Sequence, residues 1–217
     1  MILKGRLLSP KGMSLVEVMI LVVVMGLVGL GTATLMKNMV GIQKRTDLKS
    51  TINEIWHRHF LDSFQLIDFI DKNDKMLVDL GSGAGFPGIV LSIIAEERKI
   101  PLKIKLIEKS PKKINFLKEI ISQLKLNADV INKNVFDKEF KFINDVFAAR
   151  AFKPLPKILE LIHSKAKNFK KIIIFLGKSG HKELLQASKK WDIKYKQQMS
   201  ITSNDSFIIE INKLKKK

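Results

Sequence analysis

The chain contains no cysteine. This absence excludes a disulfide framework, a metal site built on thiolates and any reaction that begins with attack by a cysteine sulfur. It is compatible with a reducing compartment, where disulfides are rare, but it does not require one.

Acidic residues are also scarce, because 21 aspartates and glutamates stand against 39 lysines and arginines and give a formal net charge of +18. A field of this sign attracts polyanions, so nucleic acid and anionic lipid are the expected partners. A lysine-rich composition that reflects an AT-biased genome is the alternative. Charge alone does not separate the two interpretations.

Charge is absent altogether from residues 18–36, which form one long apolar run. At about 1.5 Å per residue, a helix of this length matches the core of a bilayer. Lys4, Arg6 and Lys11 precede the run. We therefore expect a signal peptide or a helix that associates with a membrane.

The residues that lead into this run favour a more specific interpretation. Gly12 is followed by Met13, and Glu17 is the fifth residue after the glycine. The arrangement resembles the leader of type IV pilins and pseudopilins, which are cut after such a glycine. The resemblance implies a pilin-like leader and hydrophobic helix over residues 1–47, with cleavage after Gly12 and with Glu17 paired inside a filament. A generic membrane helix is the alternative, although a buried carboxylate is costly there.

A second domain is expected over residues 48–217, because short apolar runs there alternate with amphipathic segments. The last two apolar runs are separated only by a turn, which predicts an antiparallel hairpin at the edge of a mostly parallel, seven-stranded sheet. The fold class is therefore α/β. Strands are predicted at 76–81, 102–109, 128–132, 145–150, 171–177, 193–201 and 206–212, and helices at 50–70, 110–124, 154–168 and 179–190, with a further helix opened by Pro87.

The most informative segment is VDLGSGAGFPG, where Asp79 is followed by Gly81, Gly83, Gly85 and Gly88. Glycines accept positive φ angles and let backbone N–H groups approach a ligand closely. The last three glycines match G-x-G-x-x-G, so a dinucleotide is one candidate ligand. A carboxylate beside the turn disfavours a pyrophosphate, however, and favours a cationic ligand such as S-adenosylmethionine.

A second carboxylate, Glu108, is expected at the end of the following strand. An acid at that place accepts both hydroxyls of a ribose as a bidentate pair. Enzymes that use NAD also have an acid there, so Glu108 indicates a nucleoside without choosing between the two cofactors. Asp79 is the residue that favours S-adenosylmethionine.

Three motifs now identify a family resemblance. WHRHFLDS (56–63), GSGAGFPGI (81–89) and AARAF (148–152) occur in this order, and residues 49–217 resemble the family of small-subunit ribosomal RNA methyltransferase G, formerly glucose-inhibited division protein B. The resemblance implies a Rossmann-like class I methyltransferase fold and S-adenosylmethionine as cofactor. It also implies methylation of guanine N7 in 16S ribosomal RNA, in the cytoplasm, by a monomer.

The resemblance also assigns site residues. Gly81 and Phe86 would contact the cofactor, and Arg150 would lie at the cofactor or the incoming guanine as the catalytic residue. The family usually has an arginine and a glutamate after the third strand, where this chain has NKNVFD, so Val135 and Phe136 would border the adenine. Asp79, Gly83, Gly85 and Glu108 complete the predicted cofactor site.

Guanine N7 has a free in-plane lone pair, so its methylation needs no general base. Catalysis would come from holding N7 in line with the methyl group and the sulfur. The sequence agrees with this chemistry, because it lacks both cysteine and the Asn-Pro-Pro-Tyr type of motif that acts on exocyclic amines.

The basic residues Arg58, Lys112 and Lys113 are the predicted RNA contacts, with a solvated surface charge as the alternative for each. His57 and His59 precede Asp62, but residues two apart do not share a face of a helix. We therefore predict no metal site.

The two halves of the chain imply different locations, because a pilin leader directs the rest of its chain out of the cytoplasm. We expect a chimera of two genes joined near Leu48, in which a cytoplasmic enzyme carries a passenger leader. An enzyme tethered to the inner membrane through residues 18–36 is the second choice. The remaining alternatives are a pilin-like filament protein with an inactive methyltransferase remnant and a non-catalytic RNA-binding protein.

Overall fold

The computed structural model describes residues 56–137, 140–142, 146–166 and 168–217. The predicted leader residues Gly12 and Glu17, the apolar run 18–36 and the predicted domain boundary near residue 48 all lie outside this range. The described residues belong to one unit that begins at Glu54.

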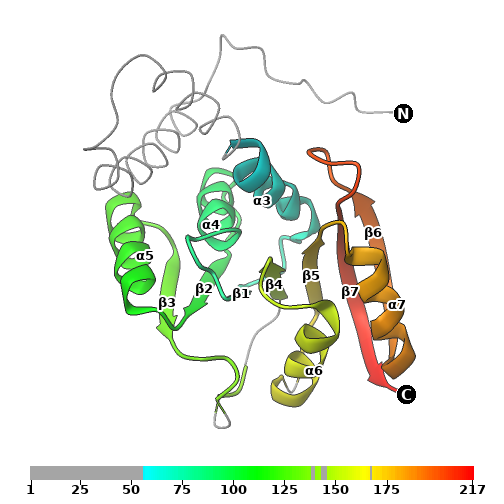
Figure 1. Ribbon diagram of the computed structural model, residues 1–217. Coiled ribbons are helices and arrows are strands. Elements are labelled where there is room, and N and C mark those ends of the chain that lie inside the picture. Colours follow the sequence, from blue (N-terminus) through cyan, green and yellow to red (C-terminus); the bar gives the residue numbers. More distant parts are fainter. Residues whose placement is uncertain (1–55, 138–139, 143–145, 167) are drawn as a thin grey trace, which may run out of the picture. The chain divides into compact units, whose positions relative to one another are not determined.

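A single seven-stranded sheet forms the centre of the described part, with the strand order β3-β2-β1-β4-β5-β7-β6 (Figure 1). Neighbouring strands from β3 to β5 run parallel, whereas β7 is antiparallel to both β5 and β6. The predicted α/β fold with its antiparallel edge hairpin is confirmed. The strands are β1 (Met76–Leu80), β2 (Lys103–Glu108), β3 (Ala128–Asn132), β4 (Val146–Arg150), β5 (Lys171–Leu176), β6 (Trp191–Met199) and β7 (Phe207–Lys216).

Burial explains why these segments form strands at these places in the sheet. The central strand β4 is apolar and buried on successive residues, as a parallel strand covered on both faces must be. The edge strand β6 is buried only at Trp191 and then exposes Lys194, Lys196 and two glutamines. Charged side chains on an edge strand discourage pairing with another chain.

Helices cover both faces of the sheet. The helices α6 and α7 pack on the face of Val78 and Leu80 and complete a large apolar core there. The helix α4 lies on the opposite face, where its first residue, Gly88, contacts Asp79. The helical segments are η2 (Trp56–Leu61), α3 (Asp62–Phe64), η3 (Gln65–Phe69), α4 (Gly88–Glu97), α5 (Pro111–Leu124), α6 (Leu155–Lys165) and α7 (Gly180–Lys190).

The first helical region differs from the single helix predicted over residues 50–70. Its described part consists of three short pieces in succession, η2, α3 and η3. Phe60 and Leu66 are buried, whereas Phe64 is exposed and lies under the guanidinium of Arg98. Pro87 also differs, because it precedes α4 as the N-cap and does not open the helix.

Among the described residues no helix is long and apolar enough to cross a membrane.

Candidate active site

The glycine-rich turn after β1 adopts a backbone that few other residues accept. Gly81, Gly83 and Gly85 have φ angles of +70°, +60° and +96°. A residue with a Cβ atom is strained at such angles, because the Cβ then approaches the backbone carbonyl. The positive φ angles therefore explain why glycine occupies these positions of the predicted ligand turn.

Close packing also requires glycine at two positions of this segment, because a Cβ atom there would overlap with a neighbouring side chain. A Cβ atom at Gly81 would lie 2.2 Å from Cδ2 of Phe152, and one at Gly88 would lie 2.2 Å from Cδ2 of Leu106. The turn is thus held between the loop after β4 and the strand β2.

We expect the substitution Gly81→Ala to lower the free energy of unfolding by about 2 kcal/mol, from backbone strain and from displacement of the Phe152 ring. The matched control is Gly177→Ala, because a Cβ atom there meets nothing within 4 Å. Urea unfolding of both variants measures the difference. Equal stability of the two variants would contradict the assigned role of Gly81.

Asp79, the residue of β1 that precedes Leu80, lies behind the turn and accepts a hydrogen bond from it. Its side chain is fully buried, and its Oδ2 accepts a hydrogen bond of 3.0 Å from the backbone N–H of Gly88. Its Oδ1 has no hydrogen-bond partner. Burial raises the pKa of Asp79 to about 7, although Ser82 and Gly88 oppose that rise.

Glu108 joins the turn to the end of β2. Its Oε2 accepts from the N–H of Gly83 at 3.0 Å, and its Oε1 accepts from the N–H groups of Lys109 and Ser110 at 2.8 and 2.9 Å. Burial alone would raise the pKa of Glu108, but the donors Ser110, Lys109 and Gly83 outweigh it, so that the pKa is lowered. Glu108 is therefore an ionised, preorganised acceptor.

A cavity of about 330 Å³, here called the first cavity, opens beside this turn. It brings together four predicted cofactor residues, namely Gly81, Glu108, Val135 and Phe136, with the predicted RNA contact Lys113. The ring of Phe136 stacks on Phe152 with 6.1 Å between centroids. The remaining lining residues are Ile107, Lys109, Lys133, Asn134, Ala151, Phe152 and Lys153.

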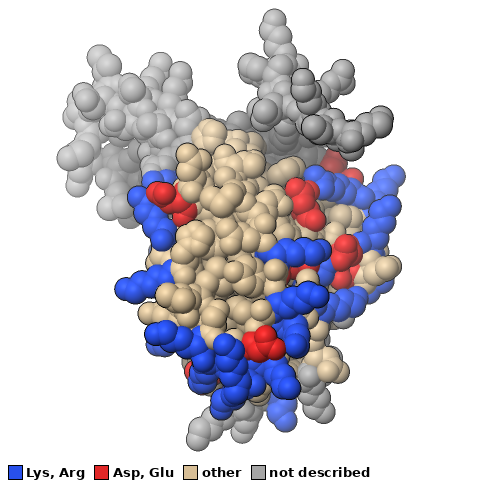
Figure 2. All heavy atoms as spheres, turned by 90° about the vertical axis from the view of Figure 1, so that its right-hand side faces the viewer, with Lys and Arg blue, Asp and Glu red and all other residues tan. Residues whose placement is uncertain are grey.

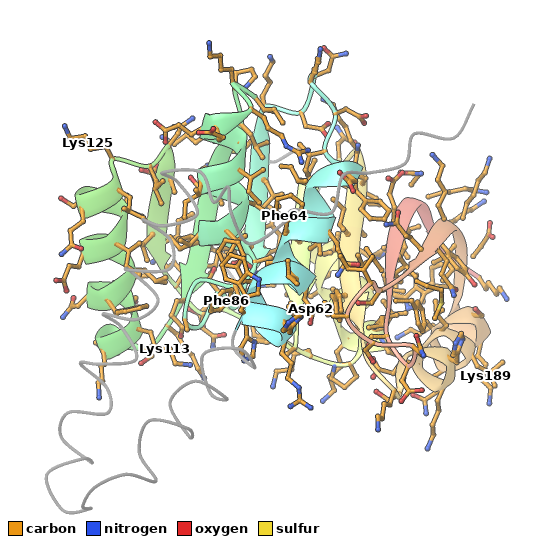
Figure 3. All side chains as sticks on the ribbon, turned by 90° about the horizontal axis from the view of Figure 1, so that it is seen from above. Asp62, Phe64, Phe86, Lys113, Lys125 and Lys189 are labelled. Carbon is orange, nitrogen blue, oxygen red and sulfur yellow. The ribbon has the colours of Figure 1, made fainter. Side chains whose placement is uncertain are left out.

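The other predicted cofactor residues do not line the first cavity. Asp79, Gly83 and Gly85 form or support the turn behind it. The ring of Phe86 packs on the ring of His59, with 5.4 Å between their centroids. Figure 3 shows Phe86 and Asp62 on the same side of the sheet, next to the α3 segment.

Arg150, at the end of β4, holds the η2 segment in place. Its Nη2 donates to the backbone carbonyl of Arg58, lies 2.9 Å from Nδ1 of His59 and is 3.4 Å from Oδ2 of Asp62. The side chains of Arg150 and Asp62 are only 13% and 9% exposed. Burial lowers the pKa of Arg150, and the charge of Asp62 opposes that shift.

This cluster extends to the hairpin at the end of the chain. The hydroxyl of Thr202 donates to Oδ1 of Asp62, and the N–H of Ile201 donates to Oε1 of Gln65 at 2.8 Å. Nothing in the sequence predicts these contacts, because Asp62 and Thr202 are 140 residues apart. A buried aspartate beside an arginine is recognisable only in the folded chain.

A second cavity of about 460 Å³ lies at the carboxyl ends of β4 and β5 and shares Ala151, Phe152 and Lys153 with the first. Sequence reasoning missed it. Ala151 has a φ of +51°, an unusual value for a residue other than glycine and one that often marks a functional site. The other lining residues are Ala149, Arg150, Pro154, Ile158, Ile174, Phe175, Leu176, Gly177, Ser179 and Glu183.

Lysines surround the entrance of the first cavity. Lys109, Lys113, Lys133 and Lys153 are all exposed, and Lys113 is close enough to Glu108 to help lower its pKa. Lys112 is exposed beside Lys113 in the first turn of α5 but does not line the cavity. Figure 2, which views the molecule from the β6 side, shows that lysines and arginines also border that face, with few acidic groups between them.

No group of three or more histidine, aspartate or glutamate side chains that would hold a metal ion occurs among the described residues. His59 and Asp62, which are not predicted to be metal ligands, are both engaged with Arg150.

Comparison with protein families gives a match over residues 34–209 to the model described as rRNA small subunit methyltransferase G. The match begins inside the segment predicted to be a leader. A curated relative of this name from Pelagibacter ubique is 43% identical over 176 residues, which are 81% of this chain and 81% of that protein. Another, from Dinoroseobacter shibae, is 33% identical and covers 75% of this chain and 83% of its own length.

Among solved structures, a SAM-dependent methyltransferase from Aquifex aeolicus is similar with a TM-score of 0.55. It is 16% identical and covers 73% of this chain and 92% of its own. A likeness at this level concerns the fold.

Proposed function

Because the chain belongs to the rRNA small subunit methyltransferase G family, we propose that it transfers the methyl group of S-adenosylmethionine to N7 of a guanine in 16S ribosomal RNA. The observation that carries the proposal is the first cavity, where a glycine turn and an ionised Glu108 meet at the carboxyl ends of β1 and β2. The proposed ribosomal substrate supports a cytoplasmic location as part of this proposal.

The side chains of the first cavity fit this cofactor. Glu108 supplies a fixed carboxylate whose Oε2 keeps an acceptor position for a ribose hydroxyl, and the buried Val135 offers an apolar wall for the adenine. Asp79 lies behind the turn, where its buried Oδ1 has no hydrogen-bond partner, and a carboxyl group at this place disfavours a pyrophosphate. S-adenosylmethionine, when bound, supplies an electrophilic methyl group on a sulfonium.

The protein's own task in this reaction is to hold the guanine. N7 carries a free lone pair, so that no side chain has to remove a proton before attack. Placement of N7 in line with the methyl group is worth a large part of the rate, and a misplacement of about 1 Å costs about 100-fold. Arg150 lines the second cavity and is proposed to position the base there.

The lysines around the first cavity are proposed to bind phosphates of the RNA substrate. Their charge does not suit a cationic cofactor, whereas a phosphate backbone that crosses the entrance would neutralise them. Lys113 and Lys125 allow a matched test, because Figure 3 shows them at opposite ends of α5, with Lys113 on the side of Phe86.

We expect Lys113→Gln to weaken binding to small ribosomal subunits and to reduce the slope of log K against log salt by about 1. Lys125→Gln makes the same chemical change at the other end of this helix and is expected to leave the slope unchanged. Binding titrations over a series of salt concentrations measure both. A slope that responds equally to the two substitutions would mean a diffuse charge effect and no phosphate contact at Lys113.

The decisive experiment incubates the full chain with labelled S-adenosylmethionine and small subunits that lack the modification. The RNA is then digested and read by mass spectrometry. The expected product is N7-methylguanine at one position. A folded chain that neither binds S-adenosylmethionine nor transfers a methyl group would overturn the proposed function.

A further inference from the structure

The second cavity lies where a methyl acceptor has to enter. It opens at the carboxyl ends of β4 and β5, and the segment Ala151–Lys153 separates it from the first cavity. A base on one side of this segment is therefore next to a cofactor on the other. On the basis of the proposed function, we infer that this cavity holds the target guanine and that Glu183 recognises its Watson–Crick edge.

Glu183 has the hydrogen-bonding capacity that this role needs. Its Oε2 accepts from the backbone N–H of Leu155 at 2.7 Å, and its Oε1 accepts from the hydroxyl of Ser179 at 2.6 Å. These two donors fix the carboxylate at the wall of the cavity. An ionised carboxylate has about four acceptor positions, so each oxygen retains one for a ligand.

Guanine is the base that matches such an acceptor. Its Watson–Crick edge presents two adjacent donors, N1–H and the N2 amino group, which a carboxylate accepts as a bidentate pair. Adenine presents an acceptor at N1, which a carboxylate repels. Bases taken out of a helix are commonly recognised through this edge.

The resulting orientation is productive for transfer to N7. N1 and N2 lie at the far end of the purine from N7, so a base whose donors face Glu183 on α7 directs N7 away from α7, and the inferred transfer requires this direction to be toward the segment Ala151–Lys153 and the first cavity. Phe152, which stacks with Phe136, offers an aromatic ring at this border. The space beside Gly177 is open, since no atom lies within 4 Å of the place where its Cβ would be.

Glu183 also ties the start of α6 to α7 through Leu155, so a loss of activity in a variant would not distinguish recognition from support. The substitution Glu183→Gln keeps an oxygen for the Leu155 N–H but removes the bidentate acceptor. Replacement of the target guanine by hypoxanthine, which lacks only the N2 amino group, tests the same contact from the RNA side. If Glu183 recognises the base, the effect of Glu183→Gln depends on whether the target is guanine or hypoxanthine. If Glu183 only supports the fold, the substitution affects both targets equally.

The experiment uses small subunits reconstituted with guanine or hypoxanthine at the position that the mass spectrometry identifies. We expect the wild-type chain to prefer guanine by about 10- to 100-fold in kcat/KM. We expect Glu183→Gln to lower kcat/KM for guanine and to reduce the preference to about 3-fold or less. The control is Glu160→Gln, a surface glutamate of α6 that pairs with Lys190, and it should keep the full preference.

A wild-type chain that methylates both bases equally would overturn the inference, even if Glu183→Gln failed to fold. So would a folded Glu183→Gln variant that loses activity on both bases in the same proportion. A wild-type chain without any methyl transfer to guanine would overturn the proposed function itself. S-adenosylmethionine binding and thermal unfolding of each variant show that the compared proteins are intact.

Discussion

Replacement of Arg150 by methionine is expected to lower kcat/KM for methyl transfer by about 100-fold or more and to destabilise the protein by about 3 kcal/mol. The activity is expected to fall because the base loses the group that is proposed to position it in the second cavity. The stability falls because Asp62, only 9% exposed, would be left buried without its basic partner. Steady-state kinetics and urea unfolding measure the two effects separately.

The double variant Arg150→Met/Asp62→Asn distinguishes these two contributions. It removes the uncompensated charge but leaves an oxygen that accepts from Thr202. We therefore expect it to recover most of the stability and none of the activity, with S-adenosylmethionine binding retained. Recovery of both would show that Arg150 only supports the fold.

The contribution of Asp79 to the stability of the protein is expected to fall as the pH rises from about 4 to 7. Burial raises the pKa of Asp79 from its ordinary value of 3.8 to about 7 in the folded state. The folded chain therefore keeps this proton where the unfolded chain releases it, so stability is full below the unfolded pKa and is lost through the folded pKa. Between about pH 5 and pH 8 the decline from this one group amounts to about 3 kcal/mol.

Asp79→Asn removes the titrating proton but retains an oxygen for the N–H of Gly88. We expect the wild type to lose about 3 kcal/mol of unfolding free energy between about pH 5 and pH 8 that Asp79→Asn does not lose. Asp129→Asn, at an exposed ion pair with Lys103, is the control and should leave the pH dependence as it is. Parallel pH profiles of wild type and Asp79→Asn would contradict an elevated pKa.

The fold was predictable because local patterns decide it. Buried parallel strands such as VFAAR are continuous apolar runs, and Ser110 with Pro111 marks the start of α5, so strand positions and helix boundaries can be read closely from the sequence. The helix predicted over residues 50–70 is the exception. Its residues change their hydrogen-bonding pattern twice within a short stretch, because they are fitted against α4 and against Arg150, contacts that no local pattern encodes.

The candidate site was predictable where short sequence motifs at the ends of strands form it. The glycine turn and Glu108 come after two neighbouring strands, and parallel strands bring their ends together. The position of Asp79 behind the turn, the contacts of Arg150 and the second cavity depend instead on tertiary packing. Glu183 in particular resembles an ordinary helical acid until α7 is placed beside the loop after β4.

The contacts between α3, η3 and the final hairpin also have a consequence for the timing of folding. Asp62 meets Thr202 across 140 residues, and Gln65 meets Ser200 across 135. A chain emerging from a ribosome exposes Arg150 well before the hairpin that completes its surroundings, and domains fold as their last elements become available. The surroundings of Arg150 and Asp62 therefore cannot be completed before the segment that forms β6 and β7 has left the ribosome.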